Sequence, residues 1–377
     1  MRLLMLLQGS AVTDQPGYHA SLLRLVQEGT LAWAQALPYL GAGPGMQVTE
    51  SAFASALRLI KDEGVDTLWL QCYHGPLPDP RPFLQAARRL HPELLVLVSS
   101  GDAFGRWLHR TPASLRQACA GADLNFLTVL GPVADAVVAA GARNLVLMPH
   151  GACQERFAAP PSRPAAPPFD VVFVGSHHAG RNPFNPINRA ARQRRAMVQA
   201  LGRRYGARFG LFGHGWGGQT GWQGPVPFVD QHRAMALGRL QVGGFPGGRA
   251  PFYLSDRPYI AMASGTPLLD CRLEGLDRLA HEGVHWALYD DLPGLLRLCD
   301  RSLEDDAGLR AMGDAARGFV LAGHTQYHRV REMLRIASEL REARRQGRRL
   351  APPAPRIFHE GVRPEDEIPH VLRAWAG

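Results

Sequence analysis

Three ionisable side chains in the first part of the chain stand near the ends of predicted parallel strands. His74 and Asp102 each come just after a buried apolar run, and His19 follows the first such run. An attacking hydroxyl needs a proton acceptor beside the reacting carbon, and an imidazole or a carboxylate can serve. The same residue types also form turns and cap helices. We therefore predict His19, His74 and Asp102 as candidate catalytic bases.

The second half of the chain carries groups that suit a phosphate. Gly175-Ser176 follow the apolar run at residues 170–174, and Arg181 comes soon after. Backbone N–H groups in such a strand-to-helix turn bind anions. The guanidinium of Arg257 could add a bidentate contact to phosphate, or it could form a structural pair with Asp256. These residues predict a site that binds phosphate.

Two other patterns suggest cofactors but lack essential parts. Residues 213–218 match G-x-G-x-x-G, yet they lie in mid-chain, and residues 219–227 hold too many glycines and prolines to form a helix. A nicotinamide cofactor is therefore not expected. His324 and His328 have the spacing of a metal pair, but no H-E-x-x-H glutamate or third ligand accompanies them. We expect no bound metal and no cofactor.

Arginine clusters contribute to a formal net charge of +9. Such clusters usually form solvated helix faces, although they could dock DNA or an acidic membrane surface. No aromatic residues are interleaved for base stacking, so nucleic acid is not the favoured acceptor. The clusters comprise Arg189, Arg192, Arg194 and Arg195, followed by Arg341, Arg344, Arg345, Arg348 and Arg349.

Alternating strand and helix patterns must position these residues. Apolar runs of strand length alternate with helical repeats through the first 150 residues, and the alternation begins again at Asp170. This rhythm predicts parallel sheets with crossover helices, in two doubly wound α/β halves. The proline-rich segment 158–168 is the predicted linker between them. Ligands bind outside the carboxyl ends of such strands, so we expect the site in the cleft between the halves.

Length and composition fit this organisation. A chain of 377 residues is long enough for two domains. The five cysteines are scattered, without the close spacing of a zinc or redox motif, so we expect reduced thiols and a cytoplasmic protein. No apolar run approaches the ~18 residues of a membrane span.

Four segments resemble motifs of the glycosyl transferases group 1 family, in its CgeB-like branch. Residues 255–269, SDRPYIAMASGTPLL, resemble its S-D-R turn followed by A-x-A-x-G-x-x-L-L. Residues 324–329, HTQYHR, resemble the H-T-x-x-H-R that begins its closing helix. Residues 171–176, VVFVGS, resemble the opening of its second domain, and residues 148–151, MPHG, the end of its first. The resemblance is good from about residue 145 to 337 and loose before that.

The resemblance implies a GT-B fold, in which two Rossmann-like domains face each other across a cleft. It implies a metal-independent glycosyltransferase that uses a nucleotide-sugar as co-substrate. We expect an acceptor domain at 1–157, the linker at 158–168, a donor domain at 169–346 and a tail at 347–377 that crosses back to the first domain. The donor-binding residues that we predict are Gly175, Ser176, Arg181, Gly213, His214, Ser255, Asp256, Arg257 and Gly265.

One position departs from the family pattern. Group 1 enzymes commonly carry a glutamate before A-x-A-x-G that accepts hydrogen bonds from the ribose, and Ile260 stands there instead. Asp256 and Glu274 are the nearest acidic substitutes in the sequence. The alternatives are therefore a degenerate sugar-nucleotide binding protein or a nucleotide-sugar epimerase. The acceptor could be a small molecule, a glycan, a protein or a modified base in DNA.

Overall fold

The chain divides into two compact units. The computed structural model describes residues 1–41, 47–105, 110–177, 186–244, 252–352 and 375–376. The first unit comprises Met1–Pro149 with Gln326–Gly377, and the second comprises His150–Thr325. Each unit contains one six-stranded sheet, so each can be described by itself.

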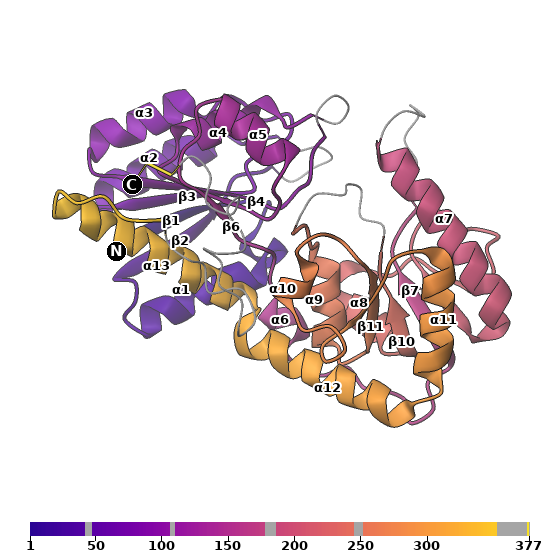
Figure 1. Cartoon of the computed structure of the whole chain (residues 1–377). Helices are drawn as coiled ribbons and strands as arrows, with labels where there is room; N and C mark the ends of the chain where they lie inside the picture. Colours follow the sequence, from indigo (N-terminus) through magenta and orange to yellow (C-terminus); the bar gives the residue numbers. More distant parts are fainter. Residues whose placement is uncertain (42–46, 106–109, 178–185, 245–251, 353–374, 377) are drawn as a thin grey trace. The chain divides into compact units, whose positions relative to one another are not determined.

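The sheet of the first unit is parallel, with strand order β2-β1-β3-β4-β5-β6. Helices α2 to α5 cover one face, and α1 and α13 pack together on the other (Figure 1). The strands are β1 (Arg2–Leu7), β2 (Trp33–Pro38), β3 (Thr67–Gln71), β4 (Leu95–Ser100), β5 (Leu124–Leu127) and β6 (Leu145–Leu147). The helices are α1 (Pro16–Gln27), α2 (Glu50–Asp62), α3 (Arg81–Leu90), α4 (Ala113–Gly121), α5 (Pro132–Ala139) and α13 (Gln326–Arg345).

The second unit repeats this plan, with strand order β12-β11-β10-β7-β8-β9. Helices α7 and α11 lie on one side of the sheet and α8 and α9 on the other (Figure 1). The strands are β7 (Phe169–Val174), β8 (Phe209–Phe212), β9 (Trp222–Gly224), β10 (Gly238–Val242), β11 (Leu268–Cys271) and β12 (Ala287–Tyr289). The helices are α6 (Gln154–Phe157), α7 (Pro186–Tyr205), α8 (Gln231–Met235), α9 (Asp256–Ala263), α10 (Leu276–Leu279), α11 (Leu292–Leu303) and α12 (Asp306–Gly323).

The central strands are buried on both faces, which explains their continuous apolar runs. Every residue of β3 is buried, and five of the six in β1. Parallel strands covered by helices on both sides require such runs rather than an alternating pattern. The prediction of two doubly wound α/β halves is therefore confirmed.

Helix α13 belongs to the first unit, although we expected residues up to 346 to lie in the second domain. It packs along α1, where Tyr327 Oη donates to Glu28 Oε2 at 2.6 Å and the guanidinium of Arg24 lies 3.8 Å from the Tyr327 ring centroid. The buried Arg329 donates from Nε to the carbonyl of Pro149 at 2.9 Å. These contacts, rather than proximity in sequence, determine where the helix lies.

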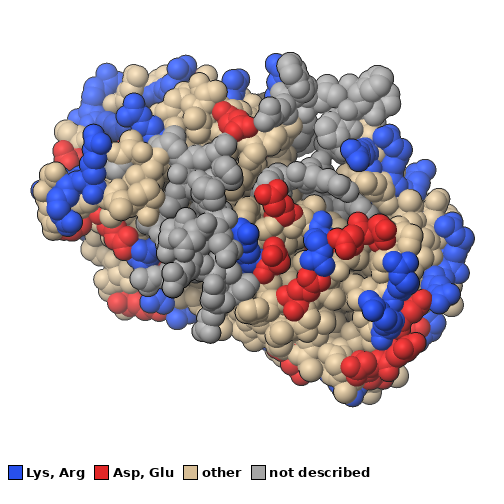
Figure 2. Space-filling model, in the orientation of Figure 1, with Lys and Arg blue, Asp and Glu red and all other residues tan. Residues whose placement is uncertain are grey.

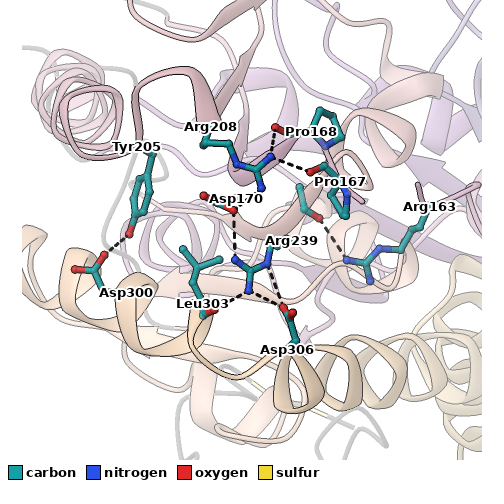
Figure 3. A network of polar contacts seen from close by, with 11 residues as sticks. Arg163, Pro167, Pro168, Asp170, Tyr205, Arg208, Arg239, Asp300, Leu303 and Asp306 are labelled. Carbon is teal, nitrogen blue, oxygen red and sulfur yellow. Dashed lines mark hydrogen bonds and ion pairs between the residues drawn. The ribbon is translucent and has the colours of Figure 1, made fainter. Parts of the chain in front are cut away.

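The proline-rich segment that we predicted as a linker is bound to the second unit by arginines. Arg208 donates to the carbonyls of Pro167 and Pro168, at 3.3 and 2.9 Å. From within the segment, Arg163 donates to the carbonyl of Gly265 at 2.9 Å. Figure 3 shows these guanidinium groups beside Arg239, which bonds both Asp170 and Asp306. Prolines lack an N–H but keep their carbonyls, so arginine can fix a segment that joins no sheet.

The second arginine cluster is partly neutralised. Arg341 pairs with Asp66 at 3.0 Å and Arg344 with Asp123 at 2.9 Å, so both help to fix α13 on the first unit. Acidic side chains also lie among the basic ones over the second unit on the face that Figure 2 shows. The charge pattern of the described residues on that face is therefore mixed rather than uniformly basic.

Most of the predicted tail, 353–374, lies outside the described residues. Near its end, the backbone N of Ala376 donates to Asn144 Oδ1 at 2.6 Å, and Trp375 Nε1 donates to the carbonyl of Leu350 at 2.7 Å. Both contacts are within the first unit. Among the described helices, none is long and apolar enough to cross a membrane.

The close contact of α12 with the end of α9 gives a stability test. A Cβ on Gly313 would lie 2.1 Å from the carbonyl oxygen of Gly265, whereas one on Gly318, in the same helix, would meet nothing within 4 Å. We expect Gly313→Ala to lower the free energy of unfolding by about 1–3 kcal/mol through overpacking. Gly318→Ala should raise it by about 0.5–1 kcal/mol because alanine favours the helix. Urea denaturation of both variants measures these changes in the free energy of unfolding. Equal changes in the two variants would contradict the close contact between Gly313 and Gly265.

Candidate functional site

The turns after β7 and β8 interlock at the carboxyl edge of the second sheet. Gly175 N donates to the carbonyl of Phe212 at 2.9 Å, and His214 N donates to Ser176 Oγ at 3.2 Å. Gly213 has φ +138°, and a Cβ there would lie 2.5 Å from the carbonyl oxygen of Gly175. Only glycine fits such an approach. The structure thus brings together four of the predicted donor-binding residues.

A buried tryptophan braces this pair of turns. Trp216 Nε1 donates to the carbonyl of Gly175 at 2.6 Å, and its ring lies against that of His177, with centroids 4.9 Å apart. The backbone N of His177 donates to the carbonyl of His214 at 2.9 Å. Trp216 is 1% exposed, so packing is its role here.

A pocket opens beside these turns, at the start of α9. Ser255 is the N-cap residue of the helix, and Arg257 lies in its first turn. Arg257 Nη1 lies 3.8 Å from the position that a Cβ on Gly175 would occupy. Ser255, Arg257, Arg194, Gly243, Gly244 and Asp270 all line the pocket. Asp256 is not among its lining residues, although we predicted it for the site.

Two guanidinium groups give the pocket its positive charge. Arg194 Nη1 donates to the carbonyl of Ser176 at 2.7 Å. Burial, together with the like charge of Arg257, lowers the pKa of Arg194 to about 10. The Nε of Arg257 is buried, and none of the described residues gives it a hydrogen-bond partner. A buried donor without an acceptor is costly, so Arg257 is suited to an anionic ligand that supplies one.

Asp270 adds a buried carboxyl group to the same pocket. It lies in β11, is 4% exposed and accepts a hydrogen bond from the backbone N of Cys271 at 2.7 Å. Burial raises the pKa of Asp270 to about 6, although Cys271 and the charge of Arg257 oppose the rise. The carboxyl is thus ionised at neutral pH at a cost to the fold.

The remaining predicted donor residues are less informative. Gly265 lies at the opposite end of α9 from Ser255, where its carbonyl accepts from Arg163, so the structure does not bring it to the pocket. Arg181 lies outside the described residues. Ile260 is 1% exposed in α9 and packs in the interior.

In the first unit, the structure brings two of the three predicted bases together. His74 Nε2 lies 3.3 Å from Asp102 Oδ2. The chain reaches this position through Cys72, whose φ of +52° turns it sharply after β3. The side chain of Asp102 is 59% exposed and that of His74 is 7% exposed. Burial lowers the pKa of His74, and the carboxylate opposes the shift. A neutral imidazole therefore orients an accessible carboxylate.

The other histidines that we considered lie elsewhere. His19 is in the first turns of α1. His324 follows α12 and stacks on Phe319, with ring centroids 4.0 Å apart, whereas His328 lies in α13 of the other unit. Among the described residues, no group of three His, Cys, Asp or Glu side chains could hold a metal ion.

Sequence reasoning missed two members of the pocket. We expected Arg194 on a solvated basic face of α7, because its neighbours are arginines and no apolar repeat distinguishes it. Asp270 had no signal beyond being a charged residue at the end of an apolar strand. That signal does identify it in retrospect, since the carboxyl ends of parallel strands meet where ligands bind.

Comparison with known proteins identifies the fold. The α-glucosyltransferase solved with UDP and a 13-mer DNA containing an HMU base is 10% identical, with a TM-score of 0.61 over 90% of this chain and 99% of that one. Anabaena HepE, solved with UDP and glucose, is 12% identical, with a TM-score of 0.55 over 90% of this chain and 100% of its own. This chain has the GT-B fold.

A third solved structure and a family model are consistent with the GT-B fold. Sucrose-phosphate synthase from Thermosynechococcus elongatus is 15% identical, with a TM-score of 0.52 over 91% of this chain and 100% of its own. Residues 192–335 match the family model described as glycosyl transferase-like, a range that includes Arg194, Arg257 and Asp270. No curated protein sequence matches the chain.

The raised pKa of Asp270 predicts a distinctive pH dependence of stability. The native pKa of about 6 exceeds the ordinary value of 3.8, so the stability that the protonated group contributes is complete below pH 4 and is lost as the pH rises through 6. The difference corresponds to about 3 kcal/mol. Asp270→Asn should therefore gain stability relative to wild type between pH 4 and pH 8, as measured by urea denaturation. If the two proteins differed in free energy of unfolding by the same amount across this range, the raised pKa of Asp270 would be contradicted.

Proposed function

We propose that this protein is a metal-independent glycosyltransferase that moves a sugar from a nucleotide-sugar donor to an acceptor hydroxyl. The observation that carries the proposal is Arg257, whose buried Nε lacks a partner among the described residues, in a pocket beside the Gly175 turn of a GT-B fold. We also propose that it belongs to the CgeB-like branch, on the motifs at 171–176, 255–269 and 324–329, and that it acts in the cytoplasm.

The pocket suits the diphosphate of the donor. When the sugar leaves, negative charge develops on the terminal phosphate, and fixed cations placed there in advance stabilise it. Arg194 and Arg257 are two such cations, and the N–H groups of the glycine turns are further candidate donors. The proposal of a uridine diphosphate donor draws on HepE and the α-glucosyltransferase, both solved with UDP.

The pair in the first unit suits activation of the acceptor. We propose that Asp102 accepts the proton of the acceptor hydroxyl, because its carboxylate is accessible. His74 would hold this carboxylate in position as a neutral hydrogen-bond donor. His19 stays a candidate that no contact with this pair supports.

The donor site is tested with arginine variants. We expect Arg257→Ala to weaken binding of UDP-glucose by about 10- to 100-fold, because a hydrogen bond between charged groups contributes about 1.5–3 kcal/mol. Isothermal titration calorimetry with UDP, UDP-glucose and GDP-mannose measures this. Arg203→Ala, which removes an exposed guanidinium from α7, is the control and should bind as wild type does. Equal affinity of wild type and Arg257→Ala for every donor would refute the site.

The catalytic pair is tested by the rate of donor consumption. Asp102→Asn should lower kcat by about 100- to 10,000-fold with little change in donor affinity, because it removes the proton acceptor. His74→Gln should lower kcat less than Asp102→Asn does. It should also shift the acidic limb of the pH profile of kcat, as expected of a residue that positions Asp102. Asp62→Asn, an exposed carboxylate on α2, is the control. Full activity of Asp102→Asn would exclude it as the base.

The same assays separate the alternatives. A binding protein would bind the donor without releasing UDP, and an epimerase would change the sugar without any acceptor. A DNA acceptor would give binding to duplex DNA with a steep dependence on salt. The pairing of Arg341 and Arg344 with aspartates leaves fewer free cations for such a surface.

A further inference from the structure

Asp270 is a buried carboxyl group that receives few hydrogen bonds from the protein. It is 4% exposed, and its hydrogen-bond donors among the described residues both belong to Cys271: the backbone N, at 2.7 Å, and the thiol. An ionised carboxylate offers about four acceptor positions, and a thiol is a weak donor. About half of the accepting capacity of this carboxylate is therefore unused.

The carboxylate faces the pocket rather than a structural partner. It lines the pocket together with Arg194 and Arg257, yet it forms no ion pair with either of them. On another side it lies against the backbone of Gly243, directly after β10, since a Cβ on Gly243 would lie 2.8 Å from its Oδ1. A side chain at 243 would cover the carboxylate, and the sequence has none there. The surroundings thus leave the carboxylate open toward the ligand space.

The charged side chains of the pocket indicate which chemical groups its ligand must carry. Two guanidinium groups attract phosphate, whereas a carboxylate repels it and instead accepts hydrogen bonds from hydroxyl groups. A ligand that satisfies both must carry hydroxyls close to a diphosphate. Building on the proposed function, we propose that Asp270 is a specificity-determining residue that accepts hydrogen bonds from the hydroxyl groups of the nucleotide-sugar.

Asp270 lies in the pocket, unlike the two acidic residues that the sequence suggested as substitutes for the family's glutamate. Neither Asp256 nor Glu274 lines the pocket. The backbone carbonyl of Glu274 accepts a hydrogen bond from Phe252 N at 2.8 Å. Ile260 is buried and cannot accept a hydrogen bond. Among the described residues, Asp270 is therefore the acidic side chain that the pocket offers.

The ionisation of Asp270 predicts that ligand affinity depends on pH, which gives a second test of its role. Burial raises its pKa to about 6, against the opposing charge of Arg257 from α9. Arg194 from α7 lines the same pocket, and Tyr289 from β12 donates from its hydroxyl to the carbonyl of Gly243 at 2.8 Å. The pKa of Arg194, about 10, keeps its guanidinium charged at pH 5 to 8, and the raised pKa of Tyr289 keeps its phenol neutral. Protonation of Asp270 removes acceptor capacity. Affinity for UDP-glucose should therefore fall as the pH drops from 7.5 to 5. Both phosphates of UDP-glucose are esterified, so the ligand itself does not titrate in this range.

The deciding experiment compares ligands with and without hydroxyls. Calorimetry at pH 7.5 measures inorganic pyrophosphate, UDP and UDP-glucose against wild type, Asp270→Asn and the control Asp314→Asn, an exposed carboxylate on α12. We expect Asp270→Asn to bind UDP-glucose at least tenfold more weakly and pyrophosphate as tightly as wild type or more tightly. A parallel loss for UDP assigns the contact to the ribose, and a loss for UDP-glucose alone assigns it to the sugar.

Two results would overturn the inference. One is unchanged or tighter binding of UDP-glucose by Asp270→Asn, which would show a carboxylate that only opposes the phosphates. The other is a wild-type affinity for UDP-glucose that does not change between pH 7.5 and 5, a measurement that needs no variant. If the wild type binds no nucleotide-sugar at all, the proposed function fails instead, so the two failures are distinguishable.

Discussion

The backbone contact between Gly175 and Gly213 is the constraint on which the candidate site depends. It brings the ends of β7 and β8 so close that no Cβ fits at Gly213, and Trp216 fixes the pair by bonding the carbonyl of Gly175. Ser176 then presents its carbonyl to Arg194, and Arg257 Nη1 lies close to Gly175. The two interlocked turns thus form the surface beside which both arginines lie.

The pocket is a place where the fold gives up stability. Arg194 and Arg257 are like charges near each other, and Asp270 is a buried carboxyl that pairs with neither. Burial of the Asp270 carboxyl without an ion pair, and of the Arg257 Nε without an acceptor among the described residues, is unfavourable. Proteins retain such groups mainly where a ligand supplies the missing interactions. Elsewhere in the second unit arginines are matched: Arg239 with Asp170 and Asp306, and Arg208 with Asp170 (Figure 3). The contrast within one unit distinguishes binding groups from structural ones.

Arginine has three different uses in this chain, and sequence composition does not separate them. Arg163 and Arg208 hold the proline-rich segment through backbone carbonyls. Arg341 and Arg344 fix α13 through aspartates of the first unit. Arg257 has a buried N–H that the described residues leave without an acceptor. The net charge of +9 therefore says little about partners until each guanidinium is assigned a neighbour.

The sequence by itself determined the two α/β halves, the glycine turns after β7 and β8, and the position of Arg257 at the start of α9. These features are local, because strand periodicity, turn chemistry and helix starts are written in consecutive residues. Only the tertiary structure decided that Arg194 points inward, that Asp270 faces the pocket, that His74 meets Asp102, and that α13 packs on α1. Each of these depends on which distant segments lie side by side, and a local pattern carries no information about that.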